Sequence, residues 1–186
     1  MARTKIVLAG EGGQGVQSVA KILVEAGYEV GKEILYIPNF GVEQRGGVSI
    51  AFCQISDGKI GEPRFSKGDI VIMLSDRAID RCSTYVDENT TVIYDSSVCT
   101  IKPEMKAKKI IGVEANKIAN EQLSSRVFNI IILGVIISAT GVLEISDIKN
   151  AMELALGKKF DAKPELRDLN HKALEMGMGL IEKASV

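Results

Sequence analysis

The chain has 186 residues, of which 46% are hydrophobic and 25% charged, and its formal net charge at pH 7 is −1. These values predict one globular domain over residues 1–186, and the absence of a basic surplus argues against nucleic acid or anionic lipid as a partner. The apolar stretch 127–139 is shorter than the ~20 residues that span a bilayer, and residues 1–5 lack the features of a signal peptide, so we expect a cytoplasmic protein without membrane contact.

The first half of the chain begins with a strand and a helix. Residues 5–9 (KIVLA) predict a buried parallel strand, and apolar residues at helical spacing predict a helix over residues 15–30 that Gly31 ends. Residues 33–41 predict a second strand. Residues 47–65 alternate around Asp57-Gly58, a common tight-turn pair, which predicts a β-hairpin.

The second half alternates strands and helices. Strands are predicted at 69–74, 91–95 and 108–114, and helices at 78–86, 115–122 (a short helix or a turn), 126–140, 147–156 and 164–184. Ser124 or Ser125 is expected to cap the third of these helices, Ser146 the fourth, which Gly157 ends, and Pro164 opens the last. The order predicts a three-layer α/β domain with a mostly parallel sheet, a Rossmann-like first βα unit and an inserted β-hairpin.

Gly10, Gly12 and Gly15 form a GxGxxG pattern between the first strand and the first helix. Such a loop lets backbone N–H groups and the helix N-terminus approach a phosphate, although the glycines could instead serve only close packing of helix and strand. A nicotinamide dinucleotide site also needs an acidic residue at the end of the second strand. That strand ends in YIPNF, which argues against NAD.

Residues 39–52 (NFGVEQRGGVSIAF) form a second unusual segment. Arg45 followed by Gly46-Gly47 would leave both a guanidinium and backbone accessible, which suits an anion or a subunit contact. The alternative is an irregular loop with a solvated arginine.

The cysteines, the histidine and the acid–base candidates do not form a recognisable metal or catalytic motif. The three cysteines are far apart without a CxxC pair, which argues against an iron–sulfur or zinc site built from this chain's cysteines alone. His171, the single histidine, is expected to be structural or exposed. The acid–base candidates around one predicted strand end are not spaced as a pair, so no catalytic residue is named; they are Asp69, Asp76, Arg77 and Asp80.

The motifs GEGGQGV and PNFGVEQRGGVS together resemble the gamma subunits of 2-oxoacid:ferredoxin oxidoreductases, which act on pyruvate, 2-oxoglutarate or ketoisovalerate. These subunits carry GxGGQG followed by a segment like SYGxExRGG, and Asn39-Phe40 departs from that pattern. The segment RVFNIIILGVIISATGVLEISDIKNAM and the ending LNHKALEMG, with Asn170, Ala173 and Gly177, are also similar, so the resemblance spans nearly the whole chain.

The resemblance implies a subunit that is inactive alone and helps to bind coenzyme A and assemble the complex. The cofactor-binding residues it implies are Gly10, Gly12, Gly13, Gln14, Gly15, Arg45 and Gly46. Thiamine diphosphate, Mg²⁺ and iron–sulfur clusters would lie on partner alpha, beta and ferredoxin-like delta subunits, with ferredoxin as acceptor, and the isolated chain could dimerise. Consistent with this, KGDIV lacks the GDG of a thiamine site. The alternatives are a stand-alone nucleotide- or flavin-binding module and a purely structural scaffold.

Overall fold

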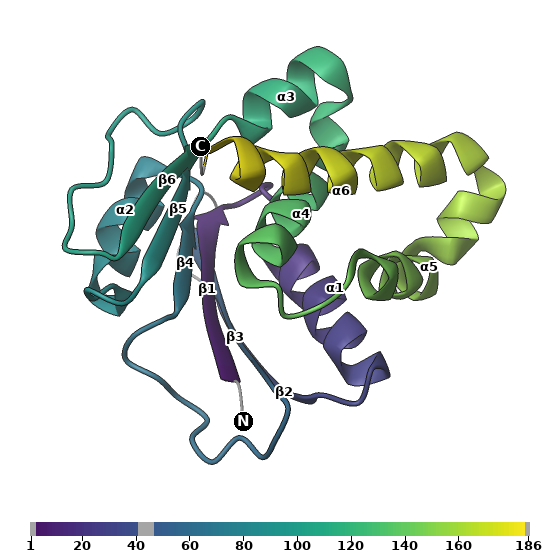
Figure 1. The fold of residues 1–186 in the computed structure, drawn as a ribbon. Helices are drawn as coiled ribbons and strands as arrows, with labels where there is room; N and C mark the ends of the chain where they lie inside the picture. Colours follow the sequence, from purple (N-terminus) through teal and green to yellow (C-terminus); the bar gives the residue numbers. More distant parts are fainter. Residues whose placement is uncertain (1–2, 41–46, 185–186) are drawn as a thin grey trace.

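The computed structural model describes residues 3–40 and 47–184, which form a six-stranded sheet with helices on both faces (Figure 1). The strand order across the sheet is β2-β3-β1-β4-β5-β6. The strands are β1 (Arg3–Glu11), β2 (Glu33–Asn39), β3 (Val48–Ser56), β4 (Ile70–Met73), β5 (Thr91–Asp95) and β6 (Lys109–Val113).

The sheet is mostly parallel, as predicted. β1 pairs in parallel with β4, β4 with β5 and β5 with β6, whereas β3 runs antiparallel to both of its neighbours, β1 and β2. β4 is buried on both faces, which explains its continuous apolar sequence IVIM. The carboxyl ends of β1, β2, β4, β5 and β6 therefore meet at one edge of the sheet.

The predicted hairpin around Asp57-Gly58 is wrong. β3 pairs instead with the preceding strand β2, with Glu33 opposite Ser56 and Asn39 opposite Ile50. Because β1 and β2 occupy both edges of β3, residues 59–65 have no free edge to join. They form a loop that Gln54 holds, since its Nε2 donates to the Glu62 carbonyl oxygen at 2.9 Å.

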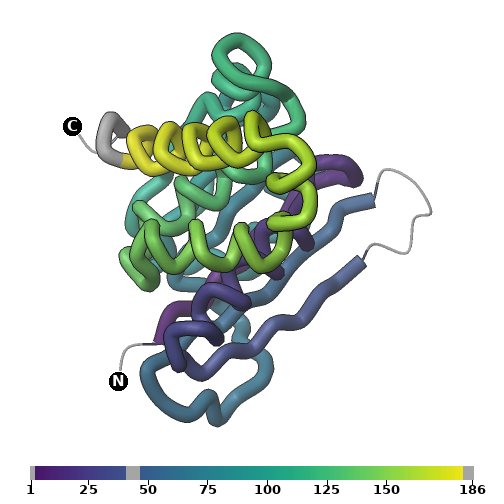
Figure 2. Tube along the Cα trace, turned by 90° about the vertical axis from the view of Figure 1, so that its right-hand side faces the viewer, coloured from purple at the N-terminus to yellow at the C-terminus, as the bar shows by residue number. Residues whose placement is uncertain are grey.

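Helices cover the two faces unequally. α2 (Asp76–Cys82) and the 3₁₀ turn Ser83–Tyr85 pack on one face. The other face carries α1 (Val16–Glu29), α3 (Ala115–Gln122), α4 (Phe128–Thr140), α5 (Ile145–Ala162) and α6 (Pro164–Ala184). Figure 2 looks from that side, with α5 and α6 in front of the sheet and β2 and β3 running side by side.

α4 is the apolar centre of the larger layer. Nine of its thirteen residues are buried, and the backbone of α6 lies directly against it at Gly134 and Gly177. Its apolar sequence therefore reflects enclosure by α1, α3 and α6. Among the described helices, none combines the length and hydropathy needed to cross a membrane.

Several predicted helix ends are shifted. α2 begins at Asp76, two residues early, because the Ser75 side chain accepts a hydrogen bond from Ala78 N and caps it. α5 begins with a capping box between Glu144 and Asp147 instead of at Ser146, and it continues past Gly157 to Ala162. The buried ring of Phe160 anchors this extra turn, which outweighs the helix-breaking tendency of one glycine.

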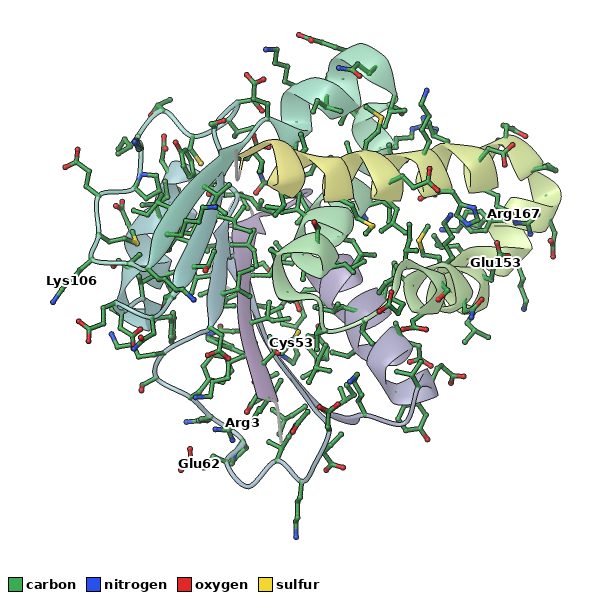
Figure 3. The ribbon with its side chains drawn as sticks, viewed as in Figure 1. Arg3, Cys53, Glu62, Lys106, Glu153 and Arg167 are labelled. Carbon is green, nitrogen blue, oxygen red and sulfur yellow. The ribbon has the colours of Figure 1, made fainter. Side chains whose placement is uncertain are left out.

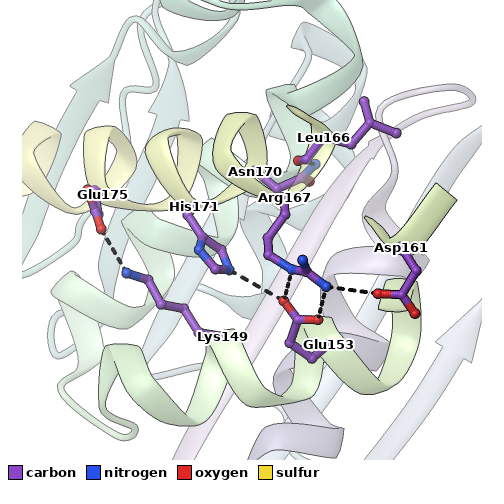
Figure 4. Close-up of polar contacts among 8 residues, drawn as sticks. All are labelled: Lys149, Glu153, Asp161, Leu166, Arg167, Asn170, His171 and Glu175. Atoms are coloured by element: carbon purple, nitrogen blue, oxygen red, sulfur yellow. Dashed lines mark hydrogen bonds and ion pairs between the residues drawn. The ribbon is translucent and has the colours of Figure 1, made fainter. Parts of the chain in front are cut away.

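α5 and α6 form a helical hairpin joined by polar contacts (Figure 4). Arg167 donates from Nε to Glu153 Oε1 at 2.7 Å and from Nη2 to Oε2 at 3.1 Å, and the guanidinium lowers the pKa of Glu153. His171 Nε2 lies 4.0 Å from Glu153 Oε1, so the single histidine belongs to this interhelical contact. Lys149 Nζ adds a 2.8 Å ion pair to Glu175.

Candidate functional site

The glycine loop connects the end of β1, Glu11, with the start of α1, Val16. Gly13 has φ 96° and Gly15, the N-cap of α1, has φ 75°, both in the left-handed region that side chains disfavour. The chain therefore needs glycine at these two positions to turn from the strand into the helix.

The four glycines of the loop, at positions 10, 12, 13 and 15, fall into two pairs according to the space around their Cβ positions. A Cβ at Gly10 would lie 3.2 Å from the Leu74 Cβ, and one at Gly15 would lie 2.9 Å from the Asn129 Cβ, so these two glycines permit close packing. Apart from the adjacent residues, no described atom lies within 4 Å of a Cβ placed at Gly12 or Gly13, and both residues are exposed. Gly10 and Gly15 therefore serve close packing, whereas Gly12 and Gly13 are accessible. The sequence pattern alone had left packing and ligand access as alternatives.

The N-terminus of α1 follows this open turn. Gly15 offers no side chain to cap the helix, and the first intrahelical bond runs from Val19 N to the Gly15 carbonyl oxygen at 3.0 Å. The N–H groups of residues 16–18 precede that bond, and the first turn contains no acidic residue. The helix dipole at this end favours an anionic group.

Gln14 points inward from the loop. Its Oε1 accepts from Glu11 N at 2.6 Å, and its Nε2 donates to the Leu74 carbonyl oxygen at 2.8 Å. The side chain therefore links the end of β1 to the end of β4.

The second unusual segment leads to the same edge of the sheet. Gly47 enters β3, where Val48 pairs with Glu11 and Ser49 with Gly10. The fold thus brings the glycine loop beside the start of β3. Arg45 and Gly46, the other two residues of the expected binding set, lie outside the described residues.

A second glutamine fastens α1 to this edge. Gln17 Nε2 donates to Ser49 Oγ at 2.7 Å, and its Oε1 accepts from the Tyr36 hydroxyl at 2.5 Å. Helix α1 is thereby tied to both β2 and β3. Neither residue type nor spacing signalled Gln17, Ser49 or Asn129 in the sequence, because their partners come from distant segments.

The topology also disfavours a nicotinamide dinucleotide. In the usual dinucleotide fold the second strand lies next to the first, so its terminal acid reaches the ribose. Here β3 separates β2 from β1, and β2 ends at Asn39. Both the missing acid and the displaced strand argue against NAD.

The acid–base candidates do not converge. Asp69 precedes β4 at the opposite edge of the sheet, where its Oδ2 accepts from Lys5 N at 2.7 Å. Asp76 holds the loop after β5 by accepting from Thr100 N at 2.9 Å, and the hydrogen bonds from Thr100 and Ile101 lower its pKa. Asp80 is exposed on α2 beyond Arg77.

Asp95, at the end of β5, was not singled out from the sequence. Its carboxylate is buried and accepts from Ser97 N and Asn116 N, both at 2.9 Å, so it ties β5 to the start of α3. Burial raises its pKa, although these hydrogen bonds oppose the rise. The contacts give Asp95 a structural role.

The thiols do not form a metal centre. Burial raises the pKa of Cys53, Cys82 and Cys99 to about 12, which favours the protonated thiols. Cys53 lies between the sheet and α1 (Figure 3), whereas Cys82 lies on the other face of the sheet. Within residues 3–40 and 47–184, no three His, Cys, Asp or Glu side chains are grouped to hold a metal ion.

Residues 5–180 match the family model described as "Pyruvate ferredoxin/flavodoxin oxidoreductase". The chain belongs to this family. The match covers both unusual segments and extends into α6, which confirms the resemblance inferred from the motifs.

Curated members of the pyruvate ferredoxin/flavodoxin oxidoreductase family include close relatives. The chain is 33% identical over 151 residues to the pyruvate/ketoisovalerate oxidoreductases common subunit gamma of Pyrococcus furiosus, covering 77% of this chain and 82% of that one. It is 31% identical over 173 residues to the ketoisovalerate oxidoreductase subunit VorA of Methanothermobacter marburgensis, covering 93% of this chain. The chain spans only about a third of the length of that VorA subunit, 35%.

Solved structures of the family share the fold. The gamma subunit of a keto/oxoacid ferredoxin oxidoreductase from Geobacter sulfurreducens superposes with a TM-score of 0.84 at 26% identity, covering 99% of each chain. A 2-oxoglutarate:ferredoxin oxidoreductase from Magnetococcus marinus, solved with 2-oxoglutarate, coenzyme A and succinyl-CoA, gives a TM-score of 0.87 at 22% identity, covering 98% of this chain and 32% of that one.

Proposed function

We propose that this chain is the gamma subunit of a 2-oxoacid:ferredoxin oxidoreductase, an enzyme that oxidatively decarboxylates a 2-oxoacid, forms an acyl-coenzyme A and reduces ferredoxin. The gamma subunits of Pyrococcus furiosus and Geobacter sulfurreducens, which match along most of their length, support this assignment. The substrate is pyruvate, 2-oxoglutarate or a branched-chain 2-oxoacid, and its contacts lie on partner subunits.

The chain itself contributes the glycine loop, which we propose contacts a phosphate of coenzyme A. The supporting observation is the exposed Gly12-Gly13 turn beside the uncapped N-terminus of α1. The Magnetococcus marinus relative, which shares the fold, was solved with coenzyme A bound. Gly10, Gln14 and Gly15 shape the loop, and Arg45 and Gly46 supply a second anion contact in the proposal.

The redox and decarboxylation chemistry belongs to the partners. Thiamine diphosphate with Mg²⁺, and iron–sulfur clusters, are proposed to reside on alpha, beta and delta subunits. The three cysteines of this chain lie on two faces of the sheet and do not converge on a cluster site. The complex would work in the cytoplasm, and the exposed Tyr28, Phe40 and Leu154 side chains are compatible with dimerisation of the isolated chain.

The loop assignment is tested with Gly12→Asp and its neutral isostere Gly12→Asn in the complex assembled with partner subunits. Gly12 has open space for either side chain. A carboxylate beside a bound phosphate is repelled in a partly desolvated site, so we expect the KM for coenzyme A to rise about tenfold or more in Gly12→Asp and far less in Gly12→Asn. Steady-state kinetics with varied coenzyme A measures this difference.

Gly61→Asp is the matched control. Gly61 also has open space around its Cβ, and it lies in the loop after β3, next to Glu62, at the opposite end of the sheet (Figure 3). This variant carries the same added charge and should leave the KM for coenzyme A unchanged. An unchanged KM in Gly12→Asp, in a complex that assembles normally, would show that the loop does not bind coenzyme A.

A further inference from the structure

Gln14 lies between β1 and β4, the two neighbouring strands whose following helices pack on opposite faces of the sheet. The helix after β1 packs on one face and the helix after β4 on the other, and β1 and β4 are neighbours. In open α/β sheets, the crevice between two such strands at their carboxyl ends is the usual place for a ligand. Here the Gln14 side chain spans that crevice, with hydrogen bonds to Glu11 N and to the Leu74 carbonyl oxygen.

The crevice is filled as well as bridged. A Cβ at Gly10 would lie 2.5 Å from Gln14 Oε1 and 3.1 Å from a Val16 methyl group. The bare backbone of Gly10 therefore makes room for the glutamine side chain. Leu74 N also donates to the Ala9 carbonyl oxygen at 2.9 Å, so a backbone hydrogen bond holds the two strand ends together in addition to Gln14.

The same residue also closes the glycine turn by two hydrogen bonds with Glu11. Gln14 N donates to the Glu11 carbonyl oxygen at 3.2 Å, while Gln14 Oε1 accepts from Glu11 N at 2.6 Å. Backbone and side chain thus close the turn at both of its ends. Gly12 and Gly13, between them, are exposed and have open space around their Cβ positions.

We propose that Gln14 is a positioning residue that seals the β1–β4 crevice and preorganises the Gly12-Gly13 turn, so that a phosphate-bearing ligand binds on the outer side of the loop and inserts no group between the strands. This inference rests on the proposed binding of coenzyme A at the loop. It goes further by stating where that ligand lies and which side chain holds the loop ready. Preorganisation lowers the cost of ordering the loop on binding.

The test uses Gln14→Leu in the assembled complex. Leucine removes both hydrogen bonds but keeps an apolar side chain of comparable volume in the crevice. We expect the KM for coenzyme A to rise about tenfold, while kcat at saturating coenzyme A and the KM for the 2-oxoacid stay within about twofold. Gln14→Glu retains an acceptor for Glu11 N but turns a carboxylate oxygen toward the Leu74 carbonyl, and it should raise the same KM.

Gln54→Leu is the matched control for a merely structural loss. Gln54 is fully buried and also donates to backbone carbonyl oxygens, of Glu62 at 2.9 Å and Pro63 at 3.3 Å. It pairs with Lys5, toward the start of β1 and away from the glycine loop. This variant should lower the melting temperature without changing the KM for coenzyme A.

The outcomes separate this inference from the proposed function. A raised KM for coenzyme A in Gly12→Asp with an unchanged KM in Gln14→Leu overturns the positioning role and leaves coenzyme A at the loop. If Gln14→Leu lowers kcat and raises both KM values together, Gln14 is only structural. If Gly12→Asp has no effect, both proposals are wrong, because the loop then holds no phosphate to position.

Discussion

At the scale of single residues, the glycine loop shows one amino acid used for different reasons. Gly15 combines φ 75° with a close approach to Asn129 on α4, whereas Gly31, after α1, has φ 76° and open space around its Cβ position. The two share a backbone conformation and differ in their surroundings. Gly15 therefore contributes to packing between α1 and α4 in addition to making the turn.

Gly15→Ala and Gly31→Ala measure these two contributions. Gly31→Ala should cost about 1–2 kcal/mol of unfolding free energy, the strain of a left-handed alanine. Gly15→Ala should cost about 1–3 kcal/mol more, because its Cβ also meets Asn129 at 2.9 Å. Urea denaturation of the purified chain gives both values, and equal costs would contradict the packing role.

At the scale of elements, Ala173 and Gly177 in the C-terminal helix reflect how α6 packs on α4. Ala173 is fully buried, and Asn170 Nδ2 donates to the Leu166 carbonyl oxygen at 2.6 Å within α6. A Cβ at Gly177 would overlap the Ile131 carbonyl of α4, and one at Gly134 would overlap the Leu174 carbonyl of α6. The two helices approach so closely because each has a glycine at the contact.

Gly177→Ala and Gly179→Ala test this contact within one helix. Since backbone cannot move aside cheaply, Gly177→Ala should destabilise the chain by about 1–3 kcal/mol or more. Gly179 has open space around its Cβ, so Gly179→Ala should stabilise the chain by up to about 1 kcal/mol through helix propensity. Thermal melts of the two variants should shift in opposite directions, and a shared direction would refute the close approach.

At the scale of the whole molecule, the sheet edge gathers two motifs that are separated in the sequence. The glycine loop follows β1, the segment with Arg45 precedes β3, and the Glu11–Val48 pairing places the two strand ends side by side. The described part of the chain groups no residues suited to a metal ion. The fold thus brings the two motifs to the same edge of the sheet.

The purified chain should therefore be inactive alone. With a 2-oxoacid, coenzyme A and a redox dye, we expect no dye reduction above background, because the thiols are protonated and dispersed and the acid–base candidates do not converge. Adding the partner subunits should produce the activity, as the positive control. Dye reduction by the chain alone would contradict the division of chemistry proposed above.

The sequence by itself determined the strands β1, β4, β5 and β6, the helices α1, α4 and α6, and the family. Buried parallel strands and an enclosed helix must be apolar throughout, and the glycines mark turns that other residues cannot make, so these features leave a local pattern. The predicted β-hairpin around Asp57-Gly58 was wrong because β2 and β1 already pair with both edges of β3. The local alternation of residues 47–65 does not depend on those pairings and so could not reveal them.

The tertiary structure alone decided which strand pairs with β3, which glycines are open and what Gln14 does. Each depends on residues far apart in the chain: Gln14 on Leu74, Gly15 on Asn129 and Gly177 on Ile131. A contact between side chain and backbone 60 residues apart produces no periodic pattern or fixed spacing in the sequence. Such a contact depends on which surfaces meet when the core packs.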